Sequence, residues 1–348
     1  MFFSHFKSLS GKARHQGLLT HDREGRFTTE MGKWLPQRSS APLAMPLASV
    51  LVTICLLLWM VQNAITTRKS YSLVGGKGKR MTLTPLSPLA KAIAWGYLAF
   101  LLLLSIVIPY FSIISTSLIK LRGFGLSAGN FTLSHYAELF SETENDALSA
   151  IGNSLFLGIA SATLCAILGT LIVLTVRKHK KSGKILEAQS LLPEMLPGIV
   201  LVIGIMLFWN DIYSLLPLYN TMVILVITYA ILFLPYTVQY VTSAFTQMSE
   251  SLTEAGRVFG GSSCYIFRHI TLPLILKGVC AGWMMTFIIS VRELVAPSLI
   301  APPNTLVIST YIMREFEQGS VSLGMSMAVL CVAITVSALM ILKRRMRL

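Results

Sequence analysis

Charged residues are scarce in this chain of 348 residues, where Asp, Glu, Lys and Arg together make up 13% of the sequence. Soluble domains carry about 25% charged residues, so the composition excludes an ordinary soluble fold. Hydrophobic residues make up 54% of the chain, and its mean hydropathy is +0.68. These values predict a polytopic membrane protein.

The chain also lacks the motifs of catalytic and cofactor sites. No Gly-x-x-x-x-Gly-Lys-Ser/Thr pattern occurs anywhere, and the glycine-rich stretch 74–79 does not supply one. None of the five cysteines forms a Cys-x-x-Cys pair, and His135, His179 and His269 lie in separate segments. We therefore expect no disulfide, metal site, cofactor, catalytic residue or ATP site of the chain's own.

Acidic residues are outnumbered, with 15 Asp and Glu against 29 Lys and Arg, which gives a formal net charge of +14. In a membrane protein the first explanation of such an excess is a set of basic cytoplasmic loops. The basic residues are spread over separate loops, which disfavours nucleic-acid binding. We expect no nucleic-acid partner.

Long apolar runs divide the chain into seven predicted spans, since about 20 apolar residues cross a bilayer. The spans are expected at about 43–62, 92–115, 150–176, 192–209, 220–243, 274–300 and 321–342. A polar, basic N-terminal tail, 1–42, precedes the first span. A basic cytoplasmic connector, 63–91, separates the first span from the rest, 92–348.

Loop charge predicts the orientation of the spans. The strongly basic stretch 177–190 is placed inside, and 63–91, 244–273 and the C-terminal basic cluster then also fall inside. The acidic loop 116–149, with 210–219 and 301–320, falls outside. With seven spans the tail 1–42 also lies outside, although it carries seven Lys and Arg, and the sequence leaves that conflict open.

A polar segment, 249–273, separates the fifth and sixth predicted spans and carries its own helix signals. Ser251 and Glu254 have the spacing of a capping box at a helix start. Gly260-Gly261 is typical of a helix end, because glycine adopts the left-handed conformation at little cost. The apolar residues Leu252, Ala255 and Phe259 then fall on one face of the helix.

A second short helix is expected after these glycines. Ser262 or Ser263 can cap it, and Pro273 is expected to close it. Its apolar residues are Ile266, Phe267 and Ile270. Taken alone, the segment also fits an amphipathic interfacial loop of any polytopic protein.

The spacing within this segment resembles a known signature. Permease subunits of binding-protein-dependent ABC importers carry Glu-Ala-Ala, three residues, Gly, nine residues, and Ile-x-Leu-Pro. Both intervals recur here, with Gly256 as the one departure, a small residue in place of a small residue. The matching residues are Glu254-Ala255-Gly256, Gly260 and Ile270-Thr271-Leu272-Pro273.

The resemblance implies an all-α fold, a polytopic transmembrane helical bundle with about seven spans around a type I ABC importer permease core at about 149–342. In that family the loop is a coupling helix that docks into a groove of the cytoplasmic ATPase. The residues to which this role would extend are Leu252, Glu254, Ala255, Gly256, Phe259, Gly260, Ile270, Leu272 and Pro273.

The resemblance also implies partners and a location. The partners would be cytoplasmic ABC ATPase subunits, a periplasmic or lipid-anchored substrate-binding protein and a second permease half, in a bacterial plasma (inner) membrane. The chain would be no enzyme itself, because a separate ATPase drives transport. It looks most like the C-terminal half of a ferric-iron-type fused permease, which suggests iron(III) or another small ion or solute as substrate.

Three charged residues are candidates for the translocation path or gate. Arg292 and Glu293 form an ionic pair within the sixth predicted span and resemble the Arg-Glu-Leu of ferric-iron-type permeases. Charges at bilayer depth usually face a bundle interior or a water path, but the pair could equally fix helix packing. Glu194 precedes Pro197-Gly198 and is either interfacial or part of the path.

Two other functions stay open at this point. A secondary ion-coupled transporter would use Arg292 and Glu293 in an ion relay and would show inverted repeats and interrupted helices, but no internal repeat is clear. Alternatively, the chain is a non-functional half of a split permease gene.

Overall fold

The computed structural model describes residues 87–346, except 128, 142–144, 215–216 and 219, together with six positions between 50 and 61. The chain divides into two units, 1–65 and 66–348, and each is described by itself. The six positions of the first unit are helical and exposed: Val50, Thr53, Ile54, Leu57, Met60 and Val61. The predicted tail 1–42, most of the span 43–62 and most of the connector 63–91 lie outside the described residues.

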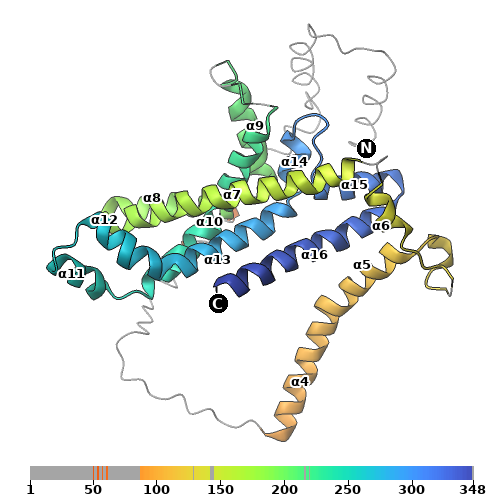
Figure 1. Ribbon diagram of the computed structural model, residues 1–348, viewed down its shortest axis with the longest axis horizontal. Coiled ribbons are helices and arrows are strands. Elements are labelled where there is room, and N and C mark those ends of the chain that lie inside the picture. Colours follow the sequence, from red (N-terminus) through yellow and green to blue (C-terminus); the bar gives the residue numbers. More distant parts are fainter. Residues whose placement is uncertain are drawn as a thin grey trace. The chain divides into compact units, whose positions relative to one another are not determined.

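The described part of the second unit is built of helices, and its β contact is one isolated bridge between Ile119 and Phe131. The elements of its first half (Figure 1) are α4 (Pro88–Leu102), the π turn η2 (Leu103–Val107), α5 (Ile108–Leu118), η3 (Arg122–Phe124), α6 (Ser134–Leu139), α7 (Asn145–Lys178), α8 (Lys180–Met195) and α9 (Gly198–Asp211). Those of its second half are α10 (Met222–Thr246), α11 (Glu250–Val258), α12 (Ser263–Ile266), the π turn η5 (Phe267–Thr271), α13 (Leu272–Val291), α14 (Val295–Ile300), α15 (Ile308–Gln318) and α16 (Val321–Met346).

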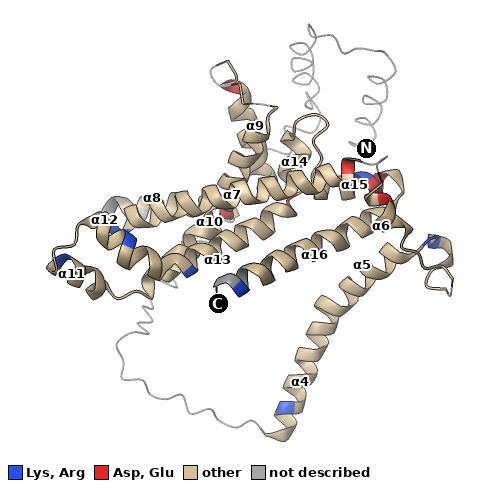
Figure 2. Ribbon diagram, in the orientation of Figure 1, with Lys and Arg blue, Asp and Glu red and all other residues tan. Residues whose placement is uncertain are grey.

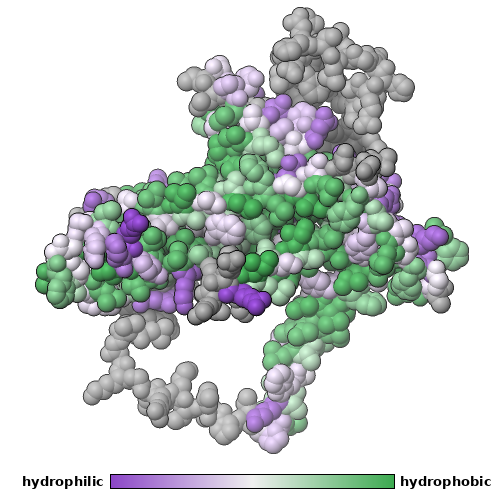
Figure 3. All heavy atoms as spheres, in the orientation of Figure 1, coloured by the Kyte–Doolittle hydropathy of each residue, from purple (hydrophilic) through white to green (hydrophobic). Residues whose placement is uncertain are grey.

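Within the described residues, five helices are long and apolar enough to cross a bilayer, and a bent pair makes a possible sixth span. The five are Pro88–Leu118, Asp146–Lys178, Met222–Thr246, Ser263–Val291 and Val321–Ile341. They correspond to the second, third, fifth, sixth and seventh predicted spans. Apolar residues cover the sides of the bundle, and hydrophilic residues gather toward its ends (Figure 3).

The fourth predicted span, 192–209, differs from the structure. Residues Ile185–Met195 of α8 and Gly198–Asp211 of α9 are bent by 110° at the break between them. Pro197 explains the break, because proline has no N–H to donate and the residue before it is driven away from helical geometry. Leu196 accordingly has an extended backbone. Helix α8, which begins at Lys180 within the basic stretch 177–190, was not predicted from the sequence.

Three prolines lie inside long spans without breaking them: Pro235 within the α-helical run of α10, and two others that each follow a π turn. Pro109 follows the π turn η2, and Pro273 follows the π turn η5, in each case two residues after the turn ends. A proline in a regular helix interior removes one hydrogen bond and its ring clashes with the carbonyl four residues earlier. The wider i→i+5 turn relieves this conflict locally. The prediction that Pro273 closes a helix is therefore wrong, and the helix continues into α13.

Three helices, α7, α10 and α13, meet closely at Thr237 of α10. A Cβ added to Gly169 of α7 would lie 2.9 Å from Thr237 Cγ2, and one added to Gly282 of α13 would lie 3.0 Å from Thr237 Cα. The Thr237 hydroxyl also lies 3.1 Å from the hydroxyl of Thr286 on α13. Small residues of this kind let membrane helices approach until their backbones pack.

The same helices touch again on either side of Thr237. Toward one end, a Cβ on Gly278 would lie 2.4 Å from Ala244 Cβ. Toward the other end, Ser161 of α7 donates a hydrogen bond to the Ser290 hydroxyl at 3.1 Å. These contacts show that α10 and α13 run antiparallel and that glycine positions set their separation.

A charged cluster joins α15 to the start of α7. Arg314 Nη1 donates to Asp146 Oδ2 at 2.6 Å, and its other terminal nitrogen lies 3.2 Å from Glu315 Oε1. Burial by itself lowers the pKa of Arg314, but the hydrogen bond and charge of Asp146, with those of Glu315, raise that pKa above its ordinary value. Glu315 is 4% exposed, so its charge is compensated within the cluster.

We predict that Gly278→Ala destabilises the bundle although it adds a single methyl group. The new Cβ would clash with Ala244, and the backbone of α13 would have to shift, at a cost of about 1–3 kcal/mol. Gly96→Ala in α4 is the matched control, because nothing lies within 4 Å of its added Cβ. The thermal unfolding midpoint of detergent-purified protein should fall only for the first variant. Equal midpoints for the two variants would contradict the close approach.

Candidate functional site

The candidate site is the segment between α10 and α13, which begins only three residues after α10 ends at Thr246. Helix α11 starts at Glu250 with Ser249 as its N-cap, and the Ser249 hydroxyl lies 2.6 Å from that of Ser251. The predicted capping box at Ser251 is therefore wrong by two residues. Because α10 extends to Thr246, the connection is short, and the chain enters α11 earlier than the serine and glutamate spacing indicates.

The end of α11 matches its prediction. Gly260 has a φ of +78°, the left-handed conformation that glycine adopts without strain. Its N–H donates to the Arg257 carbonyl at 2.9 Å, and the Gly261 N–H donates to the Gly256 carbonyl at 3.0 Å. This pair of bonds is a Schellman motif, which satisfies carbonyls at the helix end. The chain reverses there and starts α12.

The second helix begins where the sequence predicts. Ser262 is the N-cap of α12, and its hydroxyl accepts from the Tyr265 N–H at 3.2 Å. The helix then runs through η5 into α13 as one continuous span. The ring of Tyr265 stacks on that of His269, with centroids 4.2 Å apart.

Gly256 and Ile270 hold the two short helices together. A Cβ added to Gly256 would lie 2.9 Å from Ile270 Cδ1 and 3.2 Å from Ile266 Cγ1. Ile270 Cδ1 is the end of a side chain and Ile266 Cγ1 is a side-chain methylene, so an alanine at this position requires a small shift of these side chains. The packing explains why the segment uses a small residue there and why Ile266 is buried.

Large apolar side chains are exposed on α11 and at its C-cap. Phe259 is 90% exposed, Val258 84% and Leu252 46%. Ala255 lies on the same exposed side, as expected from helical spacing. Val258, three residues after Ala255, is not among the residues predicted from the sequence, and the structure adds it to this exposed apolar group.

The remaining residues of the signature lie on α11 and at the start of α13, around the contact of Gly256 with Ile270. Glu254 is exposed on α11, Leu272 is half-buried at the start of α13, and Pro273 is exposed after the π turn. The described structure therefore brings the predicted residues into one compact hairpin of helices at one end of the bundle (Figure 1). Lys and Arg residues lie around this end, whereas Asp and Glu residues gather near α15 and α6 (Figure 2).

Arg292 and Glu293 lie in the break between α13 and α14, not within a helix as predicted. The Glu293 carboxylate accepts from the backbone N–H groups of Val295 at 2.9 Å and Ala296 at 3.3 Å. The Glu293 carbonyl accepts from the hydroxyl of Ser309. Among the ion pairs of the described residues, none joins Arg292 to Glu293. The expected ionic pair is thus replaced by a carboxylate that holds the first turn of α14.

Glu194 lies elsewhere in the bundle. Near the end of α8, its carboxylate accepts a hydrogen bond from Gln239 of α10. Gln239 is two residues from Thr237 toward one end of the bundle, and Glu293 is seven residues from Thr286 toward the other end. Glu194 and Glu293 therefore lie toward opposite ends of the bundle from the contact of Thr237 with Thr286, so the structure does not bring the three charged candidates together.

The chain matches the family described as binding-protein-dependent transport system inner membrane component over residues 139–348. It is 26% identical to a Salmonella typhi protein named as the 2-aminoethylphosphonate transport system permease protein PhnV, over 74% of this chain and 96% of that protein. It is also 26% identical to the Fe(3+)-transport system permease protein FbpB 2 of Haemophilus influenzae, over 91% of this chain and 60% of that longer protein.

A solved bacterial ABC transporter involved in the import of the acidic polysaccharide alginate shares the fold, with a TM-score of 0.55 at 20% identity, over 74% of this chain and 99% of the matched chain. The predicted fold class, a helical bundle of the ABC importer permease type, is confirmed by this likeness. Because the family match extends over more than half of the sequence, the chain belongs to the binding-protein-dependent transport system inner membrane components, the permeases of ABC importers.

Proposed function

We propose that residues 249–273 form the coupling segment of this permease and dock into a cytoplasmic ABC ATPase. The observation that carries the proposal is the exposed apolar tip of Val258 and Phe259 on a short, capped helix between two spans. Large apolar side chains exposed to this degree indicate an interaction surface. A helix that inserts spaced anchors into a groove is a recurrent mode of recognition.

The rigid geometry of the segment supports a mechanical role. The Schellman turn at Gly260 and the packing of Gly256 on Ile270 fix α11 against α12. Helix α12 continues through η5 into α13, so a displacement of the tip is passed directly to a membrane span. When ATP binding closes two ATPase subunits, this connection converts the closure into alternation between inward-open and outward-open states.

The charge distribution supports the orientation that this role requires. Lys and Arg surround the coupling segment, and the last turn of α16 carries Arg344 (Figure 2). Under the positive-inside rule this end faces the cytoplasm. The opposite end would receive substrate from a periplasmic or lipid-anchored binding protein, and a second permease half would complete the path. We place the assembly in a bacterial inner membrane.

We propose that the break at Arg292 and Glu293 lies at the outer gate of the path, and that Glu194 lines it nearer the cytoplasm. Interrupted helices at membrane depth occur where backbone lines a cavity or is buried in protein. In the described chain Arg292 is exposed, whereas Glu293 holds α14. Arg292 is therefore the group available to face the path, and Glu293 positions the short helix α14.

We propose iron(III) as the substrate, on the similarity to the Fe(3+)-transport permease over 91% of this chain. The phosphonate permease is equally similar in identity, so 2-aminoethylphosphonate is the second candidate. Stimulation of ATP hydrolysis in the reconstituted transporter by binding protein loaded with iron(III), and not with the phosphonate, tests this choice. The family match disfavours a secondary ion-coupled transporter.

Replacement of Gly260 tests the coupling segment. Gly260→Val should abolish coupling, because a β-branched residue is strained at a φ of +78°. Gly260→Asn is the matched control, since asparagine tolerates the left-handed conformation. No atom lies within 4 Å of a Cβ added at this position, so the two variants differ in backbone strain and not in crowding. Co-purification of the ATPase and substrate-stimulated ATP hydrolysis are measured.

We expect Gly260→Val to lose ATPase co-purification and stimulated hydrolysis at unchanged membrane abundance. Gly260→Asn should keep both. Normal ATPase binding and normal stimulated hydrolysis in Gly260→Val would refute the coupling role of this turn. A parallel loss in both variants would show that the turn does not act through its left-handed backbone.

Substitutions at the break separate the roles of its two charges. Glu293→Gln should keep the folded protein, because the amide oxygen can still accept from Val295 and Ala296. Glu293→Ala should lower membrane abundance, since loss of a cap costs about 1 kcal/mol. Arg292→Gln should leave abundance unchanged and reduce substrate uptake. Normal uptake in Arg292→Gln would remove Arg292 from the path, and normal abundance of Glu293→Ala would remove the positioning role of Glu293.

A further inference from the structure

The loop that follows the first described span, residues 119–133, exposes an unusual number of large apolar side chains. Five of them are between 52% and 69% exposed in the described chain: Leu121, Phe124, Leu126, Phe131 and Leu133. Lys120 and Arg122 are exposed among them, and the loop contains no Asp or Glu. Its surface is therefore apolar and cationic, without acidic residues.

The loop is a folded element with Asn130 at its centre. The Asn130 carboxamide accepts from the Leu121 N–H at 2.9 Å and donates to the carbonyls of Leu121 and Gly125, both at 2.8 Å. Asn130 is 7% exposed, and the Lys120 N–H donates to its carbonyl at 2.9 Å. These polar groups form hydrogen bonds within the loop, and the large apolar side chains of the loop stay exposed.

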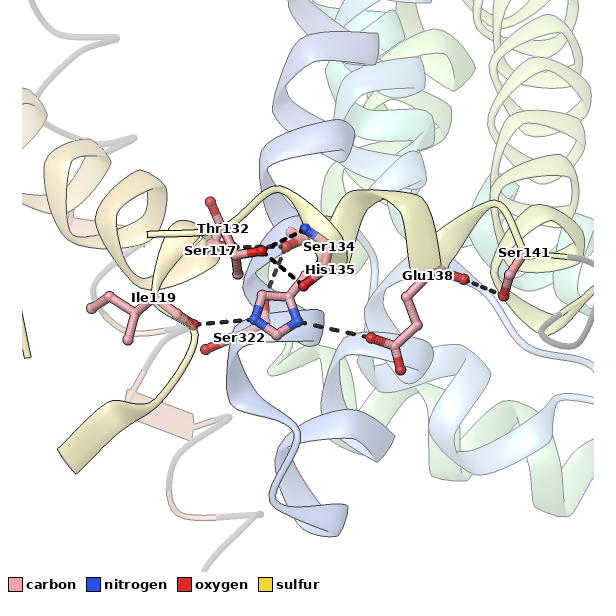
Figure 4. A network of polar contacts seen from close by, with 9 residues as sticks. Ser117, Ile119, Thr132, Ser134, His135, Glu138, Ser141 and Ser322 are labelled. Carbon is pink, nitrogen blue, oxygen red and sulfur yellow. Dashed lines mark hydrogen bonds and ion pairs between the residues drawn. The ribbon is translucent and has the colours of Figure 1, made fainter. Parts of the chain in front are cut away.

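Contacts at the base of the loop attach it to the bundle (Figure 4). His135 Nε2 lies 3.1 Å from the Ile119 carbonyl, and the Ser117 hydroxyl lies 2.7 Å from the Tyr136 hydroxyl. Ser326 of α16 donates to the Ser117 carbonyl at 3.3 Å. The loop is therefore held at a fixed height, directly at the end of the span that closes with Leu118.

The span itself continues the apolar surface. The most apolar 18-residue stretch of Pro88–Leu118 has no residue buried inside the chain. In Figure 3 the green surface of α4 and α5 continues onto the loop beyond α5, where purple residues interrupt it. Because the loop begins at the residue after the span, its apolar side chains extend the apolar surface of the span at that end.

We propose that the 119–133 loop inserts into the headgroup region of the bilayer and binds acidic phospholipid. Apolar and aromatic side chains beside Lys and Arg are the composition of interfacial membrane segments, whose apolar face enters about 5–10 Å into the headgroup boundary. Lys120 and Arg122 would contact lipid phosphates, since basic residues beside a membrane are attracted to anionic lipid. The absence of acidic residues from the loop removes the repulsion that such lipid would otherwise meet.

The test uses the full chain in lipid nanodiscs with its native cysteines replaced and a nitroxide attached at Phe124→Cys. Collision rates with oxygen, which partitions into lipid, and with a water-soluble nickel chelate report the depth of the label. Leu104→Cys in the exposed span is the hydrocarbon reference. Glu317→Cys on α15, which is also exposed, is the aqueous reference. A label at Leu126→Cys repeats the measurement without removing Phe124.

We expect both loop labels to give an oxygen-to-nickel ratio several-fold above that of Glu317→Cys. The combined change Lys120→Gln and Arg122→Gln should lower that ratio in nanodiscs of acidic phospholipid but not in zwitterionic ones. A ratio equal to that of Glu317→Cys would overturn the proposal. So would labels that neither reagent reaches, which indicate cover by a second permease half, or labels protected only when binding protein is added.

Discussion

The close approach of α7, α10 and α13 around Thr237 is the contact on which the rest of the bundle depends. In a bilayer the hydrophobic effect does not drive helices together, because lipid is as apolar as the side chains. Association therefore needs short backbone distances, and Gly169, Gly282 and Gly278 provide them. The hydroxyl contacts of Thr237 and Ser161 with residues of α13 add directional bonds at the same interface.

Both proposed working parts of the permease lie at ends of these packed helices. At one end α10 and α13 diverge into the hairpin of α11 and α12, whose apolar tip is exposed. At the other end α13 stops at Val291, and Glu293 starts the short helix α14. A rigid core between two such ends can transmit a displacement, whereas a loosely packed bundle would absorb it.

Much of this arrangement could be predicted from the sequence. Apolar runs located five of the spans. The glycine pair located the turn at Gly260, because glycine adopts the left-handed backbone conformation without steric cost. The break at Leu196 could also have been inferred from Pro197. The continuation of the helix through Pro273 could not, since the π turn that relieves a proline leaves no mark in composition.

Other features depend on tertiary contacts that no local pattern encodes. Ser249 is the N-cap of α11, and not Ser251, because α10 continues to Thr246 and shortens the connection. Arg292 and Glu293 are neighbours in sequence, but the Glu293 carboxylate accepts hydrogen bonds from backbone N–H groups of α14, and no ion pair of the described residues joins it to Arg292. The folded 119–133 loop depends on Asn130, whose bonds to Leu121 and Gly125 are set by the turn and not by a motif.

The proposed contact between the exposed tip of α11 and an ATPase can be detected in the assembled transporter. A benzoylphenylalanine in place of Val258, which is 84% exposed, is photo-crosslinked in membranes that contain the complete transporter. The same group in place of Phe124, on the 119–133 loop, is the control. We expect an adduct with the ATPase subunit from position 258 and none from position 124. An absence of the adduct at 258, or equal adducts from both positions, would contradict the proposed contact.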